Sequence, residues 1–363
     1  MSEKTSEKTN EKTNDEADAR VRELASFRHK TIMRDEVVRA LGPRADGVYA
    51  DVTLGGGGHA EAILEAADGA RLVGVDRDEL AIAAASKRLS RFGDRLRVVH
   101  APFGALEAFL PAAVADLTHS PDRKLDGVVA DLGVSSPQLD DAARGMSLRR
   151  EASSAPLDMR MDRSSGATAR DLVAELSEQA LADVLFSLGE ERRSRRIAHS
   201  IKRAIERGEM QTTGDLRHAV YEAVGGEKQG GIDPATRTFQ ALRIAVNDEL
   251  GELDRLLEAL PGVLAEGGTA AVISFHSLED GRVKRAFRMP GWTALTKGPV
   301  LASDEEIEGN PRARSAKLRA ATRSSAAETR GVRSAQRYAE RKARRFGGSS
   351  GGTGGDTGGE ASG

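Results

Sequence analysis

Hydrophobic and polar positions follow a repeating order along the first half of the chain. Short runs that are apolar on both faces occur at residues 48–53, 71–76, 95–100 and 125–131. Helical periodicity separates them at residues 60–67, 78–89 and 104–115. Strands that are apolar on both faces belong in a parallel sheet covered by helices. The alternation therefore predicts a doubly wound α/β sheet.

The regular alternation stops after the fourth predicted strand. Residues 140–233 show only helical periodicity, at 169–176, 178–188, 190–207 and 213–224. Turn-forming residues border this region at 153–156 and 225–231. We expect an inserted all-helical domain here.

The α/β pattern resumes after the predicted insertion. It consists of a long amphipathic helix at 238–260, a buried strand at 268–275, a short helix at 281–287 and an edge strand from residue 317. The predicted domains are therefore an α/β domain formed by 25–139 and 234–323, with the insertion at 140–233. Residues 1–24 repeat charged and polar positions, and 324–363 are basic and then glycine-rich, so both ends are predicted to be flexible tails.

Composition excludes some classes of protein. The chain has 39% hydrophobic and 30% charged residues, which is typical of a soluble globular protein. It shows neither an apolar run long enough for a bilayer nor a signal-peptide pattern, so we expect a cytoplasmic protein without a membrane partner. Absence of cysteine excludes disulfides, thiolate zinc sites and a cysteine nucleophile. The seven histidines lack metal-ligand spacing, so no metal site is predicted.

Four consecutive glycines at residues 55–58 separate the first predicted strand from its helix. Glycine reaches positive φ without a steric clash and allows a ligand to approach the backbone. Four in a row would be a costly choice for a purely structural turn, because each adds entropy to the unfolded chain. The stretch predicts a nucleotide-type cofactor site at the carboxyl end of a parallel strand.

The acids around this turn favour S-adenosylmethionine (SAM) over a nicotinamide dinucleotide. The glycines are contiguous rather than spaced Gly-x-Gly-x-x-Gly, and Asp51 precedes them. Asp76 ends the second strand, where a carboxylate can bind a ribose diol, and Phe103 follows the third, where its ring can cover adenine. Asp131 ends the fourth strand and points to the same cleft. The agreement of four strand ends indicates a SAM site.

Each of these residues has a structural alternative. Asp76 could cap the following helix, and Phe103 could belong to the core. Asp51 could be a hydrogen-bond acceptor for the glycine turn, and His59 an ordinary first-turn helix residue.

Five longer motifs then carry a resemblance to a known family. They occupy residues 131–141, 156–162, 234–243, 274–280 and 310–315. In this order they resemble the bacterial 16S rRNA cytosine-N4 methyltransferases (the RsmH/MraW family). The resemblance runs from about residue 29 to 323, with only a loose match at 29–36 and with tails beyond the usual family length.

The resemblance implies a class I SAM-dependent methyltransferase with a Rossmann-like sheet and an inserted helical domain for RNA recognition. The implied activity is N4-methylation of a cytosine in the decoding centre of 16S rRNA, with the rRNA or the small ribosomal subunit as partner. The family also suggests a homodimer. The implied cofactor-binding residues are Gly57, Gly58, His59, Asp76, Phe103, Asp131 and Gln138.

An exocyclic cytosine amine is a weak nucleophile, so the enzyme needs to hold and orient it. Ser136 is the candidate catalytic residue, as an acceptor for this amine, if Ser136-Pro137-Gln138 corresponds to the Ser-Pro-Pro loop of other amino-methyltransferases. Alternatively Asp131 opens the loop, and Ser135 and Ser136 only shape it, with Ser136 as a turn hydroxyl. The aromatic residue that usually follows such a loop is missing, because Leu139 follows Gln138. The stacking partner of the target base is therefore unassigned.

Two basic segments are candidates for RNA binding. The helix predicted at 190–207 has Ile197, Ile201 and Ile205 on one face and six basic residues around the rest, and a second segment lies at 312–345. A solvated basic face is the alternative.

Two other functions stay open: an amino-methyltransferase for another nucleic acid such as DNA, and a non-catalytic RNA-binding ribosome assembly factor.

Overall fold

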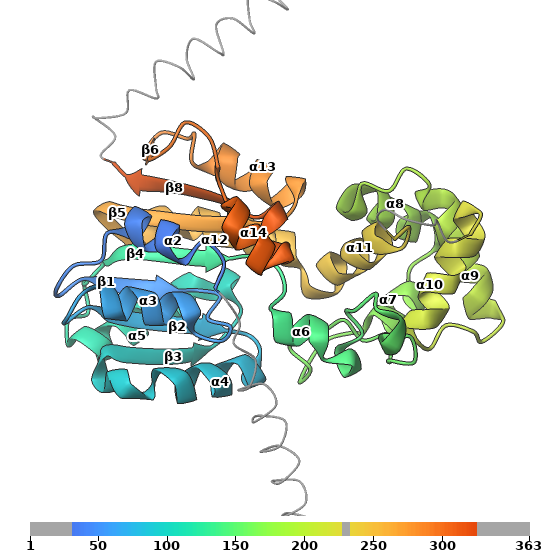
Figure 1. Ribbon diagram of the computed structural model, residues 1–363, viewed down its shortest axis with the longest axis horizontal. Helices are drawn as coiled ribbons and strands as arrows, with labels where there is room; N and C mark the ends of the chain where they lie inside the picture. The colour runs from blue at the N-terminus through green and yellow to red at the C-terminus, as the bar shows by residue number, and fades with distance from the viewer. Residues whose placement is uncertain (1–30, 227–232, 325–363) are drawn as a thin grey trace, which may run out of the picture.

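The computed structural model describes residues 31–226 and 233–324. The predicted tails at 1–24 and 324–363, apart from Ser324, lie outside the described residues. The described chain forms an α/β body and a helical body that lie side by side (Figure 1). None of the described helices is long and apolar enough to cross a membrane.

A single sheet with strand order β3-β2-β1-β4-β5-β8-β6 forms the centre of the α/β body, and β7 pairs with β8. Its strands are β1 (Val48–Asp51), β2 (Arg71–Asp76), β3 (Leu96–His100), β4 (Leu125–Asp131), β5 (Leu264–Ser274), β6 (Trp292–Ala294), β7 (Val300–Leu301) and β8 (Lys317–Arg323). Neighbours among β1 to β5 are parallel, which confirms the predicted sheet. The prediction of an edge strand from residue 317 is wrong, because β8 lies between β5 and β6 and is antiparallel to both.

Helices cover both faces of the sheet. One face packs against α2 (Arg34–Leu41), α3 (Gly58–Ala66) and α4 (Glu79–Leu89). The other packs against α5 (Leu106–Thr118), α12 (Glu249–Val263) and α13 (Ser277–Ala286). Each fully buried leucine in these layers stabilises the fold by roughly 1.5–3 kcal/mol. The layers hold the carboxyl ends of β1, β2 and β4 at one edge.

The helical body follows β4 and confirms the predicted insertion. Its helices are α6 (Ser136–Asp140), α7 (Ala169–Glu175), α8 (Glu178–Gly189), α9 (Ser194–Glu206), α10 (Thr213–Val224) and α11 (Thr236–Asn247). The last five of these share a core of their own, which includes Leu185, Ile201 and Leu242. Thr168 and Thr212 start α7 and α10 with capping boxes.

The single helix predicted at 238–260 is wrong, because the chain forms two helices there. Asp248 adopts a left-handed conformation with φ 48° and separates α11 from α12. Phe239 and Leu242 of α11 pack in the insertion core, whereas Leu253 and Leu256 of α12 pack against the sheet. By packing, the helical body thus extends to Asn247, beyond the border predicted at 233. Amphipathic periodicity continues through the break and does not reveal it.

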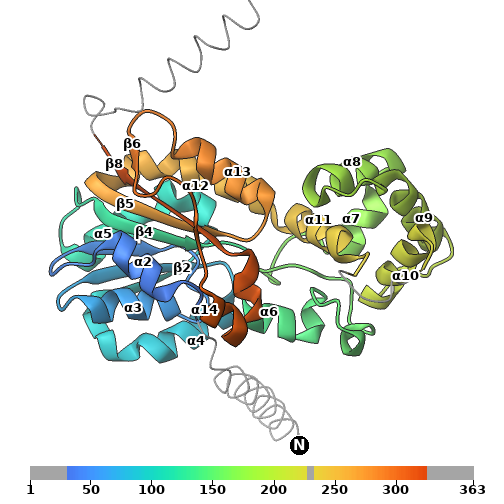
Figure 2. The ribbon, with the colours of Figure 1, turned by 45° about the horizontal axis from the view of Figure 1, so that its top comes forward.

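Buried polar contacts join the two bodies. The Arg144 guanidinium lies 2.8 Å from an Asp78 carboxylate oxygen, and both side chains are buried. Arg77, which follows β2, donates to the carbonyl of Asn247 at the end of α11 at 2.8 Å. Within the helical body, Asn247 donates to the Met159 carbonyl and accepts from the Met161 amide, both at 2.8 Å. Farther along, α14 (Asp304–Gly309) lies near α6 in Figure 2, and Arg312 pairs with Asp140 of α6 at 3.2 Å.

Candidate active site

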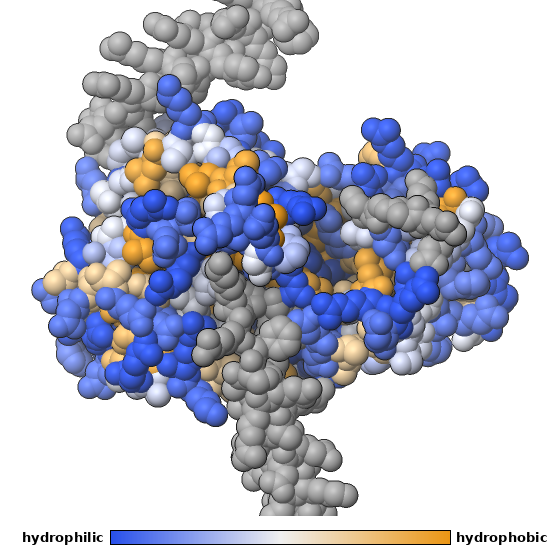
Figure 3. All heavy atoms as spheres, viewed as in Figure 1, coloured by the Kyte–Doolittle hydropathy of each residue, from blue (hydrophilic) through white to orange (hydrophobic). Residues whose placement is uncertain are grey.

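A cavity of about 440 Å³ lies where the ends of β1, β2 and β4 face the helical body. Residues from all five long sequence motifs line it, together with the glycine turn. Figure 3 shows hydrophobic side chains within the hollow between the two bodies. Segments far apart in the sequence therefore meet at this cavity. Some line it from the sheet and others line it from the insertion.

The glycine turn has the conformation that the sequence predicts. Gly55 and Gly57 have φ of 50° and 78°, which side-chain-bearing residues rarely adopt. Gly57 is the N-cap residue of α3. Gly58 has no room for a side chain, because an added Cβ would lie 1.8 Å from Thr31 Oγ1. Gly58 lines the cavity, whereas Gly57 lies just behind the lining.

Asp76 connects the turn to the end of β2. One carboxylate oxygen accepts the Gly55 amide at 2.7 Å, and the other accepts the Asp78 amide at 2.9 Å. Burial raises the pKa of Asp76 in spite of these hydrogen bonds. The alternative that Asp76 caps α4 does not hold, because Asp78 is the N-cap and accepts from Leu80. Asp76 lines the cavity and has remaining lone pairs for ligand hydroxyls.

Three residues form an acid–histidine cluster at the ends of β1 and β4, in which Asp51 and His59 are buried and Asp131 is partly buried. His59 Nε2 lies 3.5 Å from an Asp131 carboxylate oxygen, without a hydrogen bond from either ring nitrogen. Asp51 is 1% exposed and accepts the Thr53 amide at 3.2 Å, which fits its alternative role as an acceptor for the turn. Burial is the largest cause that raises the pKa of Asp51 to about 6, and His59 opposes the rise.

The cluster leaves buried acceptors without donors. One oxygen of Asp51 and one of Asp131 have no hydrogen-bond partner among the described residues. Buried carboxylate oxygens without donors are costly and favour a cationic ligand that bears N–H groups. Asp131 lines the cavity, whereas Asp51 does not. SAM carries a sulfonium and an ammonium, so the Asp131 end of the cavity fits its amino-acid part.

Two further predicted residues line the same cavity. Phe103 is half-buried after β3 and packs at the border of the core. Gln138 is buried in α6, where its Nε2 donates to Asp78 at 2.9 Å and its Oε1 accepts the Ser135 amide at 3.0 Å. Gln138 therefore fixes the loop after β4 in addition to lining the cavity. Ser136 begins α6, but its side chain lies outside the described part, so its catalytic role stays a prediction.

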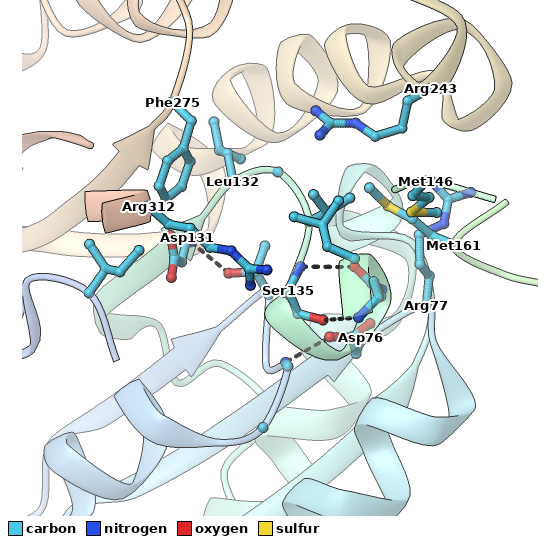
Figure 4. Close-up of a pocket in the computed structure, with 18 of the residues that line it drawn as sticks. Asp76, Arg77, Asp131, Leu132, Ser135, Met146, Met161, Arg243, Phe275 and Arg312 are labelled. Carbon is cyan, nitrogen blue, oxygen red and sulfur yellow. Dashed lines mark hydrogen bonds between the residues drawn. The ribbon is translucent and has the colours of Figure 1, made fainter. Parts of the chain in front are cut away.

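Both sides of the cavity contain residues that the sequence did not single out (Figure 4). Phe275 follows β5, Met146 and Met161 belong to the insertion, and Arg243 lies on α11. Arg243 forms two hydrogen bonds with Glu249, at 2.7 and 2.8 Å, which fix its guanidinium. All of these residues except Met146 lie within the five motifs, so the motifs already indicated the segments that form this part of the cavity. Strand and helix periodicity could not show that these side chains meet.

The basic helix α9 lies at the far side of the helical body from the sheet (Figure 1). Ile197 and Ile201 are buried and Ile205 is half-buried, as the pattern predicts. Arg195, Arg196 and Arg203 are exposed and border a surface groove with α10. Lys202 instead donates to the carbonyls of Val173 and Ala174 at the end of α7. Its ammonium is therefore bound to α7, although its side chain is only partly buried.

Comparison with known proteins shows which family the chain is similar to. The model of the MraW methylase family matches residues 26–324. The chain is 57% identical over 302 residues to "Ribosomal RNA small subunit methyltransferase H" of Sorangium cellulosum, covering 83% of this chain and 92% of that protein. A protein of the same name from Picosynechococcus sp. is 48% identical over 297 residues, covering 81% of this chain and 96% of that protein.

Proposed function

Because the chain belongs to the MraW methylase family, we propose that it transfers a methyl group from SAM to a cytosine N4 in the decoding centre of 16S rRNA. Its relatives are small-subunit ribosomal RNA methyltransferases, and the chain spans most of their length. It is accordingly a SAM-dependent methyltransferase whose substrate is small-subunit rRNA. We place this activity in the cytoplasm. The homodimer suggested by the family stays a prediction, which light scattering tests.

One observation carries the proposal: five separated motifs converge on one cavity whose halves differ in character. The sheet half has acids at successive strand ends and a glycine turn, which suits SAM. The insertion half has methionines and a fixed arginine, which suits a nucleobase with its phosphate. A methyltransferase needs such adjoining sites, because the methyl carbon and the amine nitrogen must approach each other in line.

We assign the cofactor contacts along the strand ends. Asp76 would bind the ribose hydroxyls and Phe103 would cover the adenine. The turn at Gly57 and Gly58, with Asp131, would hold the methionine part. His59 and Gln138 would support these contacts, His59 beside Asp131 and Gln138 from α6.

The bound SAM supplies an electrophilic methyl group on a sulfonium. The contribution of the protein is to orient the amine and to receive its proton. Asp131 is partly exposed at the end of β4 and can accept one N–H of the amine, which aims the nitrogen lone pair. Positioning of this kind can lower a barrier by roughly 7–11 kcal/mol. The amine proton leaves to water or to this carboxylate, and Ser136 is the second candidate acceptor.

The position of α9 suggests how the rRNA is held. Its exposed arginines lie away from the cavity, so they would contact phosphates distant from the target nucleotide. Phosphate contacts are insensitive to sequence and weaken with salt. Selectivity would then come from the shape of the rRNA and from extrusion of one base, which costs a few kcal/mol.

The decisive experiment incubates the purified protein with labelled SAM and small ribosomal subunits that lack the modification, followed by nucleoside analysis. N4-methylcytidine at one position of 16S rRNA is the expected product. Label in DNA would identify another nucleic acid as the substrate. RNA binding without methyl transfer would favour the assembly-factor alternative.

A further inference from the structure

The target base needs a flat apolar surface that the loop after β4 does not provide. Enzymes that act on an extruded base commonly hold it between aromatic or apolar side chains. In this loop Leu132 and Leu139 are the large apolar residues, and neither has an aromatic ring. The stacking surface must therefore come from another element that borders the cavity.

Three aromatic side chains line the cavity in the described part of the chain: Phe103, Phe239 and Phe275. Phe103 lies after β3, at the end that we assign to adenine. Phe239 is 5% exposed and belongs to the insertion core, so its ring is already covered. Phe275 is only partly buried, which leaves part of its ring accessible.

Sheet register brings Phe275 to the loop after β4. Asp131 pairs with Ile273 on the neighbouring strand, so Phe275 lies beside the residues that follow Asp131. A Cβ added to Gly133 would lie 3.6 Å from Cδ2 of Phe275, so the edge of the ring lies next to this glycine. Figure 4 shows Phe275 near Asp131 and Leu132. The aromatic ring thus lies beside the loop where the amine acceptor is expected.

Buried hydrogen bonds hold Phe275 in this position. Its amide donates to Glu279 Oε2 at 2.8 Å, and the His276 amide donates to the same oxygen at 3.3 Å. Glu279 is buried in the first turn of α13. Burial alone would raise its pKa, but the His276 ring, the Phe275 amide and Arg243 outweigh that cost, and the pKa of Glu279 is lowered. A charged Glu279 therefore fixes the backbone from which the ring projects.

We propose that Phe275 stacks on the extruded cytosine and replaces the aromatic residue that is absent after β4. This inference rests on the proposed function, since it names the residue that positions the base for that reaction. Base–aromatic stacking corresponds to about a tenfold to hundredfold effect on binding when the ring is removed. Phe275 follows β5, and β4 and β1 separate this strand from β2 and β3, whose ends carry the proposed ribose and adenine contacts. Loss of the ring should therefore affect RNA more than SAM.

Two variants test the proposal. Phe275→Leu keeps an apolar side chain without a ring, and Phe275→Tyr keeps the ring. We expect kcat/KM for methylation of unmodified small subunits to fall about tenfold to hundredfold in Phe275→Leu and to stay within about threefold of wild type in Phe275→Tyr. SAM affinity, measured by calorimetry, should stay within about twofold in both.

The matched control is Phe103→Leu, which should weaken SAM binding instead. Wild-type kcat/KM in Phe275→Leu would overturn the proposal. A loss of SAM affinity in Phe275→Leu would assign the ring to the cofactor half and would also overturn it, as would equal losses in the Leu and Tyr variants. If wild-type protein formed no N4-methylcytidine, the proposed function itself would fail, which is a separate outcome.

Discussion

Asp51 offers a test of the electrostatics behind the glycine turn. The side chain is fully buried, and burial raises its pKa to about 6. Asp51→Asn removes the titrating group but keeps an oxygen that can accept the Thr53 amide. The variant therefore isolates the ionisation of one carboxyl group with little change in packing.

The sign of the effect follows from linkage between protonation and folding. The folded-state pKa of Asp51 is raised above its unfolded value of 3.8, so its stabilising contribution is complete below pH 3.8 and is lost as the pH rises through about 6. A rise of about two pKa units corresponds to about 3 kcal/mol. About 2 kcal/mol of this loss should fall between roughly pH 4.5 and 7.5.

Trp292 provides the signal for the measurement. It is the only tryptophan of the chain, it is buried, and its ring centroid lies 5.1 Å from that of Phe287. It also belongs to the same core as β1. Urea unfolding of SAM-free protein, followed by Trp292 fluorescence, should show Asp51→Asn gaining about 2 kcal/mol relative to wild type over this pH range.

The matched control is Asp116→Asn, which removes a carboxyl group at the surface. Asp116 is more than half exposed and pairs with Arg97 at 3.3 Å. The free energy of unfolding of Asp116→Asn should stay within a few tenths of a kcal/mol of the wild-type value over the whole pH range. If the difference in free energy of unfolding between Asp51→Asn and wild type stayed constant across the pH range, ionisation of Asp51 would not destabilise the folded protein. The argument that an uncompensated carboxylate lies buried behind the glycine turn would then fail.

Three other predictions follow from the two bodies and their contacts. Asp76→Ala should lower SAM affinity at least about tenfold, because it removes the proposed ribose acceptor and releases the Gly55 amide; normal binding in calorimetry would reject the ribose role. Arg144→Met should cost about 3–5 kcal/mol in urea unfolding, because Asp78 would be left buried without its cation; a loss below about 1 kcal/mol would contradict this. Replacing four arginines of the α9 region by alanine should weaken RNA binding and reduce its dependence on salt, with SAM affinity intact. The control, Lys87→Ala with Arg97→Ala at the opposite end of the molecule, should leave RNA binding unchanged. Unchanged RNA affinity of the four-arginine variant at moderate salt would remove α9 from the interface. The four are Arg192, Arg193, Arg195 and Arg196.

Local patterns were sufficient to predict the parallel sheet and the strand ends that carry the acids. Strand 71–76, for example, is apolar on both faces and ends in Asp76, which lines the cavity. The positions of β8 and Phe275 could not be predicted in this way. Both depend on which strands become neighbours, and that is decided by packing between residues more than forty positions apart, as in the pairing of Ser274 with Lys317. Periodicity contains no information on such pairs.

The break at Asp248 explains why the insertion could be recognised but its connection could not. A continuous helix would carry Arg243 along the sheet, whereas the left-handed residue turns α11 back into the helical body. Arg243 then faces the cavity while its partner Glu249 begins α12. The ion pair thus spans the junction of the two bodies, and it lies at the cavity that both bodies line. Correct approach of base and methyl donor therefore depends on this junction as much as on the residues that touch either ligand.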